Sequence, residues 1–177
     1  MQRLCIAIIL SLVIPTITLG ETAPNISKKQ VSYQQLNQID KKEVDCLAEN
    51  IYFESAGEPL KGQKAVGFVT MNRLKSNLFG KSVCGIVRQK INTTCQFSWW
   101  CNAKLRYTAL NKRYDKEKYL KIQDLATNIY LNHTKMEDVT KGALFFHEKH
   151  KPKSCLGMKN IQKTIQIGQH IFYRIFT

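Results

Sequence analysis

Apolar residues recur at intervals of three and four along several stretches of the chain, which is the spacing of one face of an α-helix. Residues 40–55 and 116–132 show this amphipathic pattern, and residues 83–89 form a shorter helical piece. Residues 60–74 are apolar over most of the helix circumference, which predicts a central and largely buried helix. The pattern therefore predicts a body made of helices.

The last part of the chain has a different pattern. Residues 143–147 and 164–173 are short, β-branched and aromatic, and a polar stretch rich in lysine, proline and glycine separates them. We expect them to form a small antiparallel pair. The predicted fold class is α+β, a mainly helical domain with a small antiparallel β-sheet near the C-terminus.

The first residues have the pattern of an export signal. Arg3 precedes an apolar run over residues 4–14, and residues 18–20 offer a cleavage position, which predicts a signal peptide over residues 1–20. Pro15 interrupts the run after roughly half of the about 20 apolar residues that a membrane span needs. No stable membrane span is therefore expected after cleavage, although an uncleaved anchor is the alternative.

Polar residues dominate positions 21–39, which predicts a flexible leader. Asp40 is the expected N-cap of the first helix, and Glu43 completes a pair that resembles a capping box. Gly57 ends that helix. Removal of the first 20 of the 177 residues leaves 157, the size of one ordinary domain, which we place at 40–177 as a monomer.

The chain is strongly basic, with 27 lysines and arginines against 13 acidic residues and a net charge of +14. Such a surface attracts polyanions. An exported protein meets cell-envelope polymers and phospholipid surfaces, and no nucleic-acid-binding motif is present, so no nucleic-acid partner is expected. We expect a secreted, periplasmic or cell-wall location. A non-enzymatic, basic envelope-binding protein remains an alternative.

Five cysteines follow the signal, and an odd number leaves at least one of them unpaired within the chain: Cys46, Cys84, Cys95, Cys101 and Cys155. No spacing among them fits a zinc framework, because the close pair at 95 and 101 is separated by five residues instead of two to four. Disulfides are the better interpretation in an oxidising compartment. A bond between residues 95 and 101 would pin an irregular segment over 92–102.

Glu54 is the acidic residue with the most informative position. It lies on the core-facing edge of the first predicted helix, one turn before the break at Gly57. A carboxyl group there would be partly desolvated at the mouth of a cleft, which raises its pKa as a general acid near neutral pH requires. The alternative is a surface ion pair with Lys61 or Lys64. Glu58 is a weaker candidate. It follows Gly57 in a turn, and the alternative is that it only caps the next helix.

Collinear blocks over nearly the whole predicted domain resemble the SleB/CwlJ-type cell wall hydrolases, and a match of this extent is more specific than one short motif. The blocks are Cys46–Glu58 with Gly62, Ala65-Val66 and Asn72-Arg73, then Val83–Val87 with Gln89, Cys95–Ser98, Ala143–His147 and Ile167–Arg174. The resemblance implies a lysozyme-like fold that acts on peptidoglycan without a cofactor or metal. It also covers four of the five cysteines and so nominates Cys155 as the free thiol.

The resemblance places Glu54 on the family's catalytic glutamate, in a lytic transglycosylase that cuts between N-acetylmuramic acid and N-acetylglucosamine. Glu54 would protonate the bridging oxygen and then take a proton from the muramic acid 6-hydroxyl as a 1,6-anhydro ring closes. A single-glutamate scheme fits a sequence with no obvious second acid on a facing strand.

The other blocks imply groove residues that bind acetamido groups and hydroxyls of the sugars, namely Glu58, Gln96, Ser98, His147, His170 and Tyr173. Aromatic residues of the same region are candidates for stacking on sugar rings, namely Phe97, Trp99 and Trp100. The alternative for the aromatic residues is a position in the core, and the alternative for the histidines is a structural role. The chain departs from the family pattern at Ser55-Ala56-Gly57, where relatives carry an arginine, and at Pro152-Lys153-Ser154, where relatives carry Pro-x-Trp.

A zinc-dependent amidase is a rival interpretation, with His147, His150, Cys155 and His170 as imagined ligands. The run from His147 to His150 is one residue short of the HExxH motif, so the two histidines would not share a helix face as that motif requires. We therefore expect no metal site.

Overall fold

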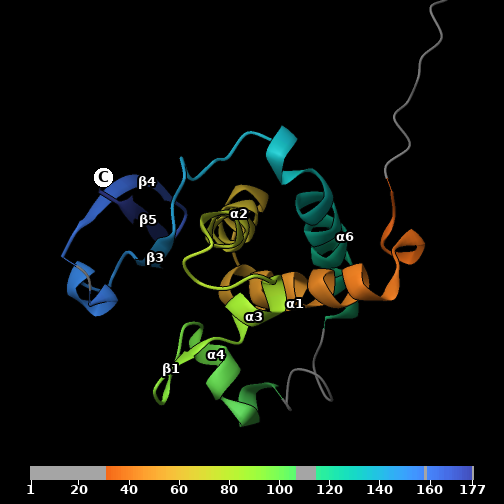
Figure 1. Ribbon diagram of the computed structural model, residues 1–177, viewed down its shortest axis with the longest axis horizontal. Helices are drawn as coiled ribbons and strands as arrows, with labels where there is room; N and C mark the ends of the chain where they lie inside the picture. Colours follow the sequence, from red (N-terminus) through yellow and green to blue (C-terminus); the bar gives the residue numbers. More distant parts are fainter. Residues whose placement is uncertain (1–30, 107–114, 158, 177) are drawn as a thin grey trace, which may run out of the picture.

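Three long helices form the body of the fold (Figure 1). They are α1 (Gln38–Ser55), α2 (Leu60–Ser76) and α6 (Lys116–Asn132). The computed structural model describes residues 31–106, 115–157 and 159–176, so the predicted signal peptide and most of the predicted leader lie outside the described residues. The predicted helices over 60–74 and 116–132 are confirmed, the second at both of its ends.

Helix α2 is central, as its apolar circumference predicts. It lies between α6 on one side and the C-terminal sheet on the other (Figure 1). The helices approach closely at Gly67, where a Cβ atom would lie 2.7 Å from Cδ1 of Ile129 on α6 and 3.1 Å from Cδ1 of Ile51 on α1. A larger residue at this position would therefore force the three helices apart.

The start of α1 differs from the prediction. Asn37 is the N-cap, and its side chain accepts a hydrogen bond from the Asp40 backbone N–H at 2.9 Å. Asp40 lies in the first turn, where its charge favours the helix N-terminus, so its assignment as N-cap is wrong. A 3₁₀ turn, η1 (Tyr33–Gln35), precedes the helix, so the predicted leader over 21–39 extends too far toward the C-terminus.

Glu43 serves another helix instead of completing a capping box. Its Oε2 accepts hydrogen bonds from the backbone N–H groups of Val83, at 2.5 Å, and Cys84, at 3.2 Å, in the first turn of α3 (Val83–Val87). A disulfide between Cys46 and Cys84 joins the same two helices. The carboxylate and the disulfide together fix α3 to α1 across 38 residues of sequence.

The segment predicted to be irregular contains secondary structure. Strands β1 (Lys90–Ile91) and β2 (Thr94–Cys95) form a short hairpin, and helix α4 (Ser98–Cys101) follows. The predicted Cys95–Cys101 disulfide is confirmed. It closes the turn between β2 and α4, which carries Gln96 and Phe97.

The C-terminal sheet has three strands, where the sequence pattern predicts two. They are β3 (Phe145–Glu148), β4 (Ile161–Ile167) and β5 (His170–Ile175), in the antiparallel order β3-β5-β4. The stretch predicted as one strand over 164–173 is a hairpin, because Gly168 takes a left-handed conformation with φ of +57° and reverses the chain. The α+β class and the antiparallel sheet near the C-terminus are confirmed.

Two further 3₁₀ turns are η2 (His133–Lys135), after α6, and η3 (Lys153–Leu156), between β3 and β4. The sheet packs on α2 through Val69 and Phe172, both fully buried. Among the helices of the described residues, none has the length and the apolar character that crossing a bilayer requires.

Candidate active site

Glu54 lies at the end of α1, beside a groove of about 520 Å³. The β1–β2 hairpin and the start of α4 form one wall of this groove, and β3 with the segment after it forms the other. The groove is lined by Glu54, Arg73, Ile91, Thr94, Cys95, Gln96, Phe97, Ser98, Phe145, Phe146, His147, Glu148, Lys151, Leu156, Gly157 and His170. A second hollow of about 410 Å³ adjoins it at Glu54, Glu148 and His170, which line both. We call the two together the catalytic groove.

The position of Glu54 changes its acidity. Burial raises the pKa of its carboxyl group to about 7, and the nearby negative charge of Glu148 adds to the rise, while Lys151 and Arg73 act in the opposite direction. Within the described ranges, neither Lys61 nor Lys64 forms an ion pair with Glu54. A carboxyl group with this pKa is partly protonated at neutral pH, as a general acid requires.

Glu148 is a second carboxyl group in the groove. It ends β3, on the wall that faces α1, and its Oε2 lies 3.4 Å from Nζ of Lys151. The expectation of no second acid on a facing strand is therefore wrong. The alternation of side chains along a strand places residues 146 and 148 on one face, and this signal would have found Glu148 if the strand had been extended by one residue.

Four of the six predicted sugar-binding residues line the part of the groove nearest α4 and β3: Gln96, Ser98, His147 and His170. Glu58 lines the adjoining hollow. Tyr173 lines neither of the two hollows. It is buried next to His147, and the two rings stack with centroids 5.3 Å apart. The structure therefore brings five of the six residues to the groove.

Both ring nitrogens of His147 have protein partners. Nδ1 lies 2.7 Å from the carbonyl oxygen of Glu148, and Nε2 lies 2.9 Å from the hydroxyl of Tyr173. A carbonyl oxygen can only accept, so Nδ1 is the donor in the first contact. These contacts fix the ring at the edge of the groove and leave neither nitrogen free for a ligand.

His170 is the better candidate for a hydrogen bond to a ligand. Its side chain is buried, yet it lines both hollows, and Nδ1 has no hydrogen-bond partner among the described residues. Burial lowers the pKa of its ring, so the neutral form dominates near neutral pH. A neutral imidazole offers one donor and one acceptor to a hydroxyl or an acetamido group.

Glu58 holds the wall of the groove in place. Its two carboxylate oxygens accept hydrogen bonds from the backbone N–H of Gln169, at 3.3 Å and 3.2 Å. Gln169 lies in the β4–β5 turn, directly before His170. Glu58 therefore joins the end of α1 to the strand that carries His170, and it does not cap α2, where Pro59 is the N-cap residue.

The candidate stacking residues are mostly part of the core. Trp99 is 3% exposed, donates from Nε1 to Oδ1 of Asn50 at 3.0 Å, and stacks on Phe53. Phe97 is 2% exposed, although it is one of the residues that line the groove. Trp100 is half-buried and lies beside Trp99, away from both hollows of the groove. The aromatic residues thus support the groove wall.

The sequence assigns no role to Arg73, which the structure places in the groove lining. Its side chain is 4% exposed, and Nε donates to the carbonyl oxygen of Leu144 at 2.7 Å. It lies in one of the blocks that carry the family resemblance, and that is the signal by which it could have been noticed.

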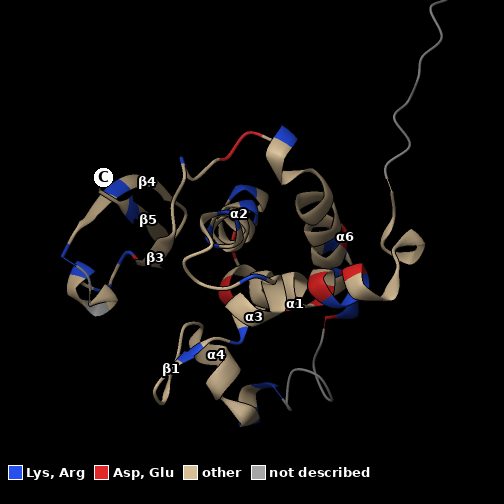
Figure 2. Cartoon of the chain, viewed as in Figure 1, with Lys and Arg blue, Asp and Glu red and all other residues tan. Residues whose placement is uncertain are grey.

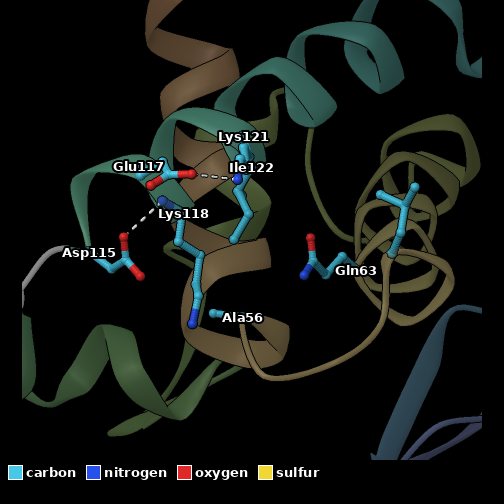
Figure 3. A pocket seen from close by; sticks show the side chains of 8 residues that line it. Ala56, Gln63, Asp115, Glu117, Lys118, Lys121 and Ile122 are labelled. Carbon is cyan, nitrogen blue, oxygen red and sulfur yellow. Dashed lines mark hydrogen bonds and ion pairs between the residues drawn. The ribbon is translucent and has the colours of Figure 1, made fainter.

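A different hollow, between the end of α1, the start of α2 and the start of α6, is shown in Figure 3. Three of its charged groups already have partners: Glu117 forms an ion pair with Lys121 at 2.6 Å, and Asp115 accepts a hydrogen bond from the Lys118 backbone N–H. Lysine and arginine residues are spread over the described elements of the chain (Figure 2). Neither feature competes with the groove as the site of chemistry.

In the described ranges, no group of three or more histidine, cysteine, aspartate or glutamate side chains is arranged to hold a metal ion. The side chain of Cys155, one of the imagined zinc ligands and the predicted free thiol, lies outside the described residues.

Comparisons with known proteins agree with the architecture. The chain is 29% identical over 132 residues to the spore cortex-lytic enzyme of Bacillus subtilis (strain 168), covering 73% of this chain and 37% of that protein. It is 42% identical over 45 residues to the spore cortex-lytic enzyme of Oceanobacillus iheyensis, covering 25% of this chain and 16% of that protein. The chain thus spans well under half the length of these relatives.

Two solved structures have a similar fold. One is the catalytic domain of the Bacillus cereus SleB protein, with a TM-score of 0.54, 24% identity, and coverage of 76% of this chain and 91% of that one. The other is the catalytic domain of the germination-specific lytic transglycosylase SleB from Bacillus anthracis, with a TM-score of 0.57, 23% identity, and coverage of 78% and 99%. They support a lysozyme-like fold for this chain.

The sequence model described as Cell Wall Hydrolase matches residues 57–173, which is more than half of the chain. The match begins just after Glu54, so the assignment rests on the groove walls and not on the candidate acid. The chain belongs to the cell wall hydrolase family, as a protein of the SleB/CwlJ type.

Proposed function

We propose that this protein degrades peptidoglycan as a lytic transglycosylase, cutting the glycosidic bond between N-acetylmuramic acid and N-acetylglucosamine. The observation that carries the proposal is Glu54, a desolvated carboxyl group with a pKa near 7 at the centre of the groove. A group in this state both gives and takes a proton at neutral pH, which a one-residue acid–base mechanism needs.

In the first step, the Glu54 carboxyl group donates its proton to the bridging oxygen while the bond from that oxygen to C1 of the muramic acid breaks. The sugar then carries positive charge shared between C1 and the ring oxygen. In the second step, the Glu54 carboxylate takes the proton of the muramic acid 6-hydroxyl, and the oxygen of that hydroxyl bonds to C1. Glu54 is restored, and no water is consumed.

The groove walls supply the contacts that orient the strand. Gln96 and Ser98 come from the wall closed by the Cys95–Cys101 disulfide, and His170 comes from the strand held by Glu58. Amide, hydroxyl and imidazole groups on opposite sides are suited to acetamido groups and sugar hydroxyls. The substrate is therefore proposed to lie across the end of α1.

Hydrolysis with a positioned water is a second candidate, favoured by Glu148. Two carboxyl groups that flank a glycosidic bond are the usual apparatus of glycosidases, one acting as acid and the other as base or nucleophile. The ion pair of Glu148 with Lys151, and its half-exposed side chain, favour an electrostatic role over a nucleophilic one. We therefore rank the transglycosylase first.

Products of purified peptidoglycan, separated and weighed, test the proposal. We expect fragments that end in 1,6-anhydromuramic acid and are one water lighter than the hydrolytic fragments. Reducing muramic acid ends would assign hydrolysis and give Glu148 a chemical role. Free stem peptides would contradict both and indicate an amidase.

The charges around Glu54 predict opposite effects of two substitutions on the pH dependence. Glu148→Gln removes a charge that raises the pKa of Glu54, so the alkaline limb of kcat/KM should move to lower pH. Lys151→Gln removes a charge that lowers this pKa, so the limb should move to higher pH. Initial rates of muropeptide release between pH 5 and 9 measure both, and shifts in the same direction would contradict the assignment of Glu54 as the titrating acid.

We also propose that the enzyme works outside the cytoplasmic membrane as a monomer, with peptidoglycan as its partner. The predicted signal peptide at residues 1–20 supports export, and the net charge of +14 suits an anionic cell envelope. Cell fractionation with and without residues 1–20 tests this placement.

A further inference from the structure

Arg73 is a buried cation without a full set of partners. Its guanidinium carbon lies 4.9 Å from the ring centre of Phe79, 5.0 Å from that of Phe97 and 5.7 Å from that of Phe145. One hydrogen bond is present, from Nε to the carbonyl oxygen of Leu144. Nη1 is buried and has no hydrogen-bond partner in the described part of the chain.

A cation in such surroundings requires compensation. Removing a charge from water is costly unless an opposite charge or hydrogen bonds replace the lost hydration. Contacts with aromatic faces recover part of this cost, and the carbonyl oxygen of Leu144 recovers another part. Neither kind of contact neutralises the positive charge of Arg73. The guanidinium group is therefore stabilised by a negative group on the side that lines the catalytic groove.

The groove holds two carboxyl groups that could provide this charge. Glu148 has Lys151 as its ion-pair partner at 3.4 Å, and its side chain is 54% exposed, so water and Lys151 already compensate it. Glu54 is less exposed and forms no ion pair within the described ranges. Glu54 is therefore the carboxylate that Arg73 complements.

We propose that Arg73 is a positioning residue that supplies the counter-charge for Glu54 after Glu54 has given up its proton. This inference rests on the proposed acid–base role of Glu54. Its side chain is only 4% exposed, so the role that we assign to it is exerted through Glu54 and not through contact with the substrate. It acts by stabilising the carboxylate that must form in the first step and then act as the base in the second.

Other charged or titratable groups face the same place. Glu148 and Lys151 lie on the β3 side of the groove, His170 lies on β5, and Glu58 lies in the turn between α1 and α2. All four residues are still present when only Arg73 is replaced. A change in Glu54 titration on replacement of Arg73 alone is therefore assigned to Arg73.

The test is a direct titration of the Glu54 carboxyl group by carbon-detected NMR on protein labelled at glutamate, with Glu54→Gln identifying the signal. In Arg73→Met and Arg73→Gln, we expect the pKa of Glu54 to rise by about one unit or more. Arg73→Lys keeps a cation and should recover at least half of that shift. Arg174→Gln removes an exposed arginine that bonds Gln162 on the neighbouring strand, and this control should leave the titration unchanged.

Activity provides a second readout. The alkaline limb of kcat/KM should move upward with the titration in both neutral variants, and kcat should fall more than tenfold because the second step needs the carboxylate. A residue that only packs would lower the amount of folded protein without moving the pH profile. The two neutral variants replace Arg73 by side chains of different polarity, and the result from either variant that folds is sufficient.

A Glu54 pKa that stays within about 0.3 unit of the wild-type value in a folded neutral variant would overturn the inference. The titration does not depend on catalysis, so it also separates this inference from the proposed function. If Glu54→Gln remains active, the proposed mechanism fails, while the titration still decides whether Arg73 complements Glu54.

Discussion

Replacing Glu54 by glutamine is expected to abolish glycan cleavage and leave the fold intact. Glutamine has nearly the same shape but no proton to give at the bridging oxygen, and it cannot take one from the 6-hydroxyl. Removal of a general acid costs roughly 10² to 10⁴ in rate, and Glu54 acts in both steps, so we expect a loss of about 10³ or more in kcat/KM. Release of soluble muropeptides from purified peptidoglycan measures it.

Glu137→Gln is the matched control, because Glu137 is exposed and lies outside the catalytic groove. Its activity should equal that of the wild type. Binding of the Glu54→Gln variant to insoluble peptidoglycan should persist, which separates an enzyme from a basic envelope-binding protein. Residual activity above one tenth of the wild-type value would remove Glu54 from the mechanism.

The same variant should be more stable than the wild type at alkaline pH. The pKa of Glu54 rises from 4.5 to about 7 in the folded protein, so its ionisation opposes folding. The wild type therefore keeps its full stability below pH 4.5 and loses about 3 kcal/mol as the pH rises through 7. Glutamine does not ionise, so denaturant unfolding should show an advantage of that order for the variant at pH 8 and none at pH 4.

The long helices were predictable because their signal is local. Helix α6 begins at Lys116 and ends at Asn132, as the apolar spacing predicts. The start of α1 was not predictable, because Asn37 and Asp40 are both good N-cap residues. The contact that distinguishes them is remote in sequence: Glu43 binds the backbone at Val83, so it is not available to pair with an N-cap at Asp40.

The number of strands in the sheet could not be predicted from a local pattern. The run over 164–173 is rich in β-branched and aromatic residues, and strand propensity alone does not say whether a glycine inside it marks a bulge or a reversal. The turn at Gly168 is bound by Glu58, whose carboxylate accepts from the Gln169 N–H across 111 residues of sequence. A pairwise contact of this range is not visible in a local window.

The residues of the site also differ in how far the sequence could predict them. Glu54 could be selected from its place on a helix face and from the family resemblance. The resemblance also includes Arg73, but its place on an apolar helix assigns it no role, because its surroundings come from three separate segments, at Phe79, Phe97 and Phe145. Glu148 was missed by one residue at a strand end. Assembly of the groove, not any single motif, determines these roles.

Replacing Gly168 by alanine is expected to cost both stability and activity. The φ of +57° is strained for any residue with a Cβ, and the new atom would lie 1.7 Å from Oε2 and 2.8 Å from Cδ of Glu58. The Glu58 carboxylate must then move away and lose its hydrogen bonds to the Gln169 N–H. His170 follows Gln169, so the groove wall shifts. We expect a loss of about 2 to 3 kcal/mol in the free energy of unfolding and more than tenfold in kcat/KM.

Gly142→Ala separates the two causes, because Gly142 also has a positive φ, of +78°, but a Cβ there meets no atom within 4 Å. This control should lose about 1 kcal/mol of stability and keep its activity. Glu58→Gln should resemble Gly168→Ala in activity without its backbone strain, because a neutral amide is a weaker acceptor for the Gln169 N–H. If Gly168→Ala behaves like Gly142→Ala in both measurements, the Glu58 contact does not position His170, and the groove wall must be held by the sheet alone.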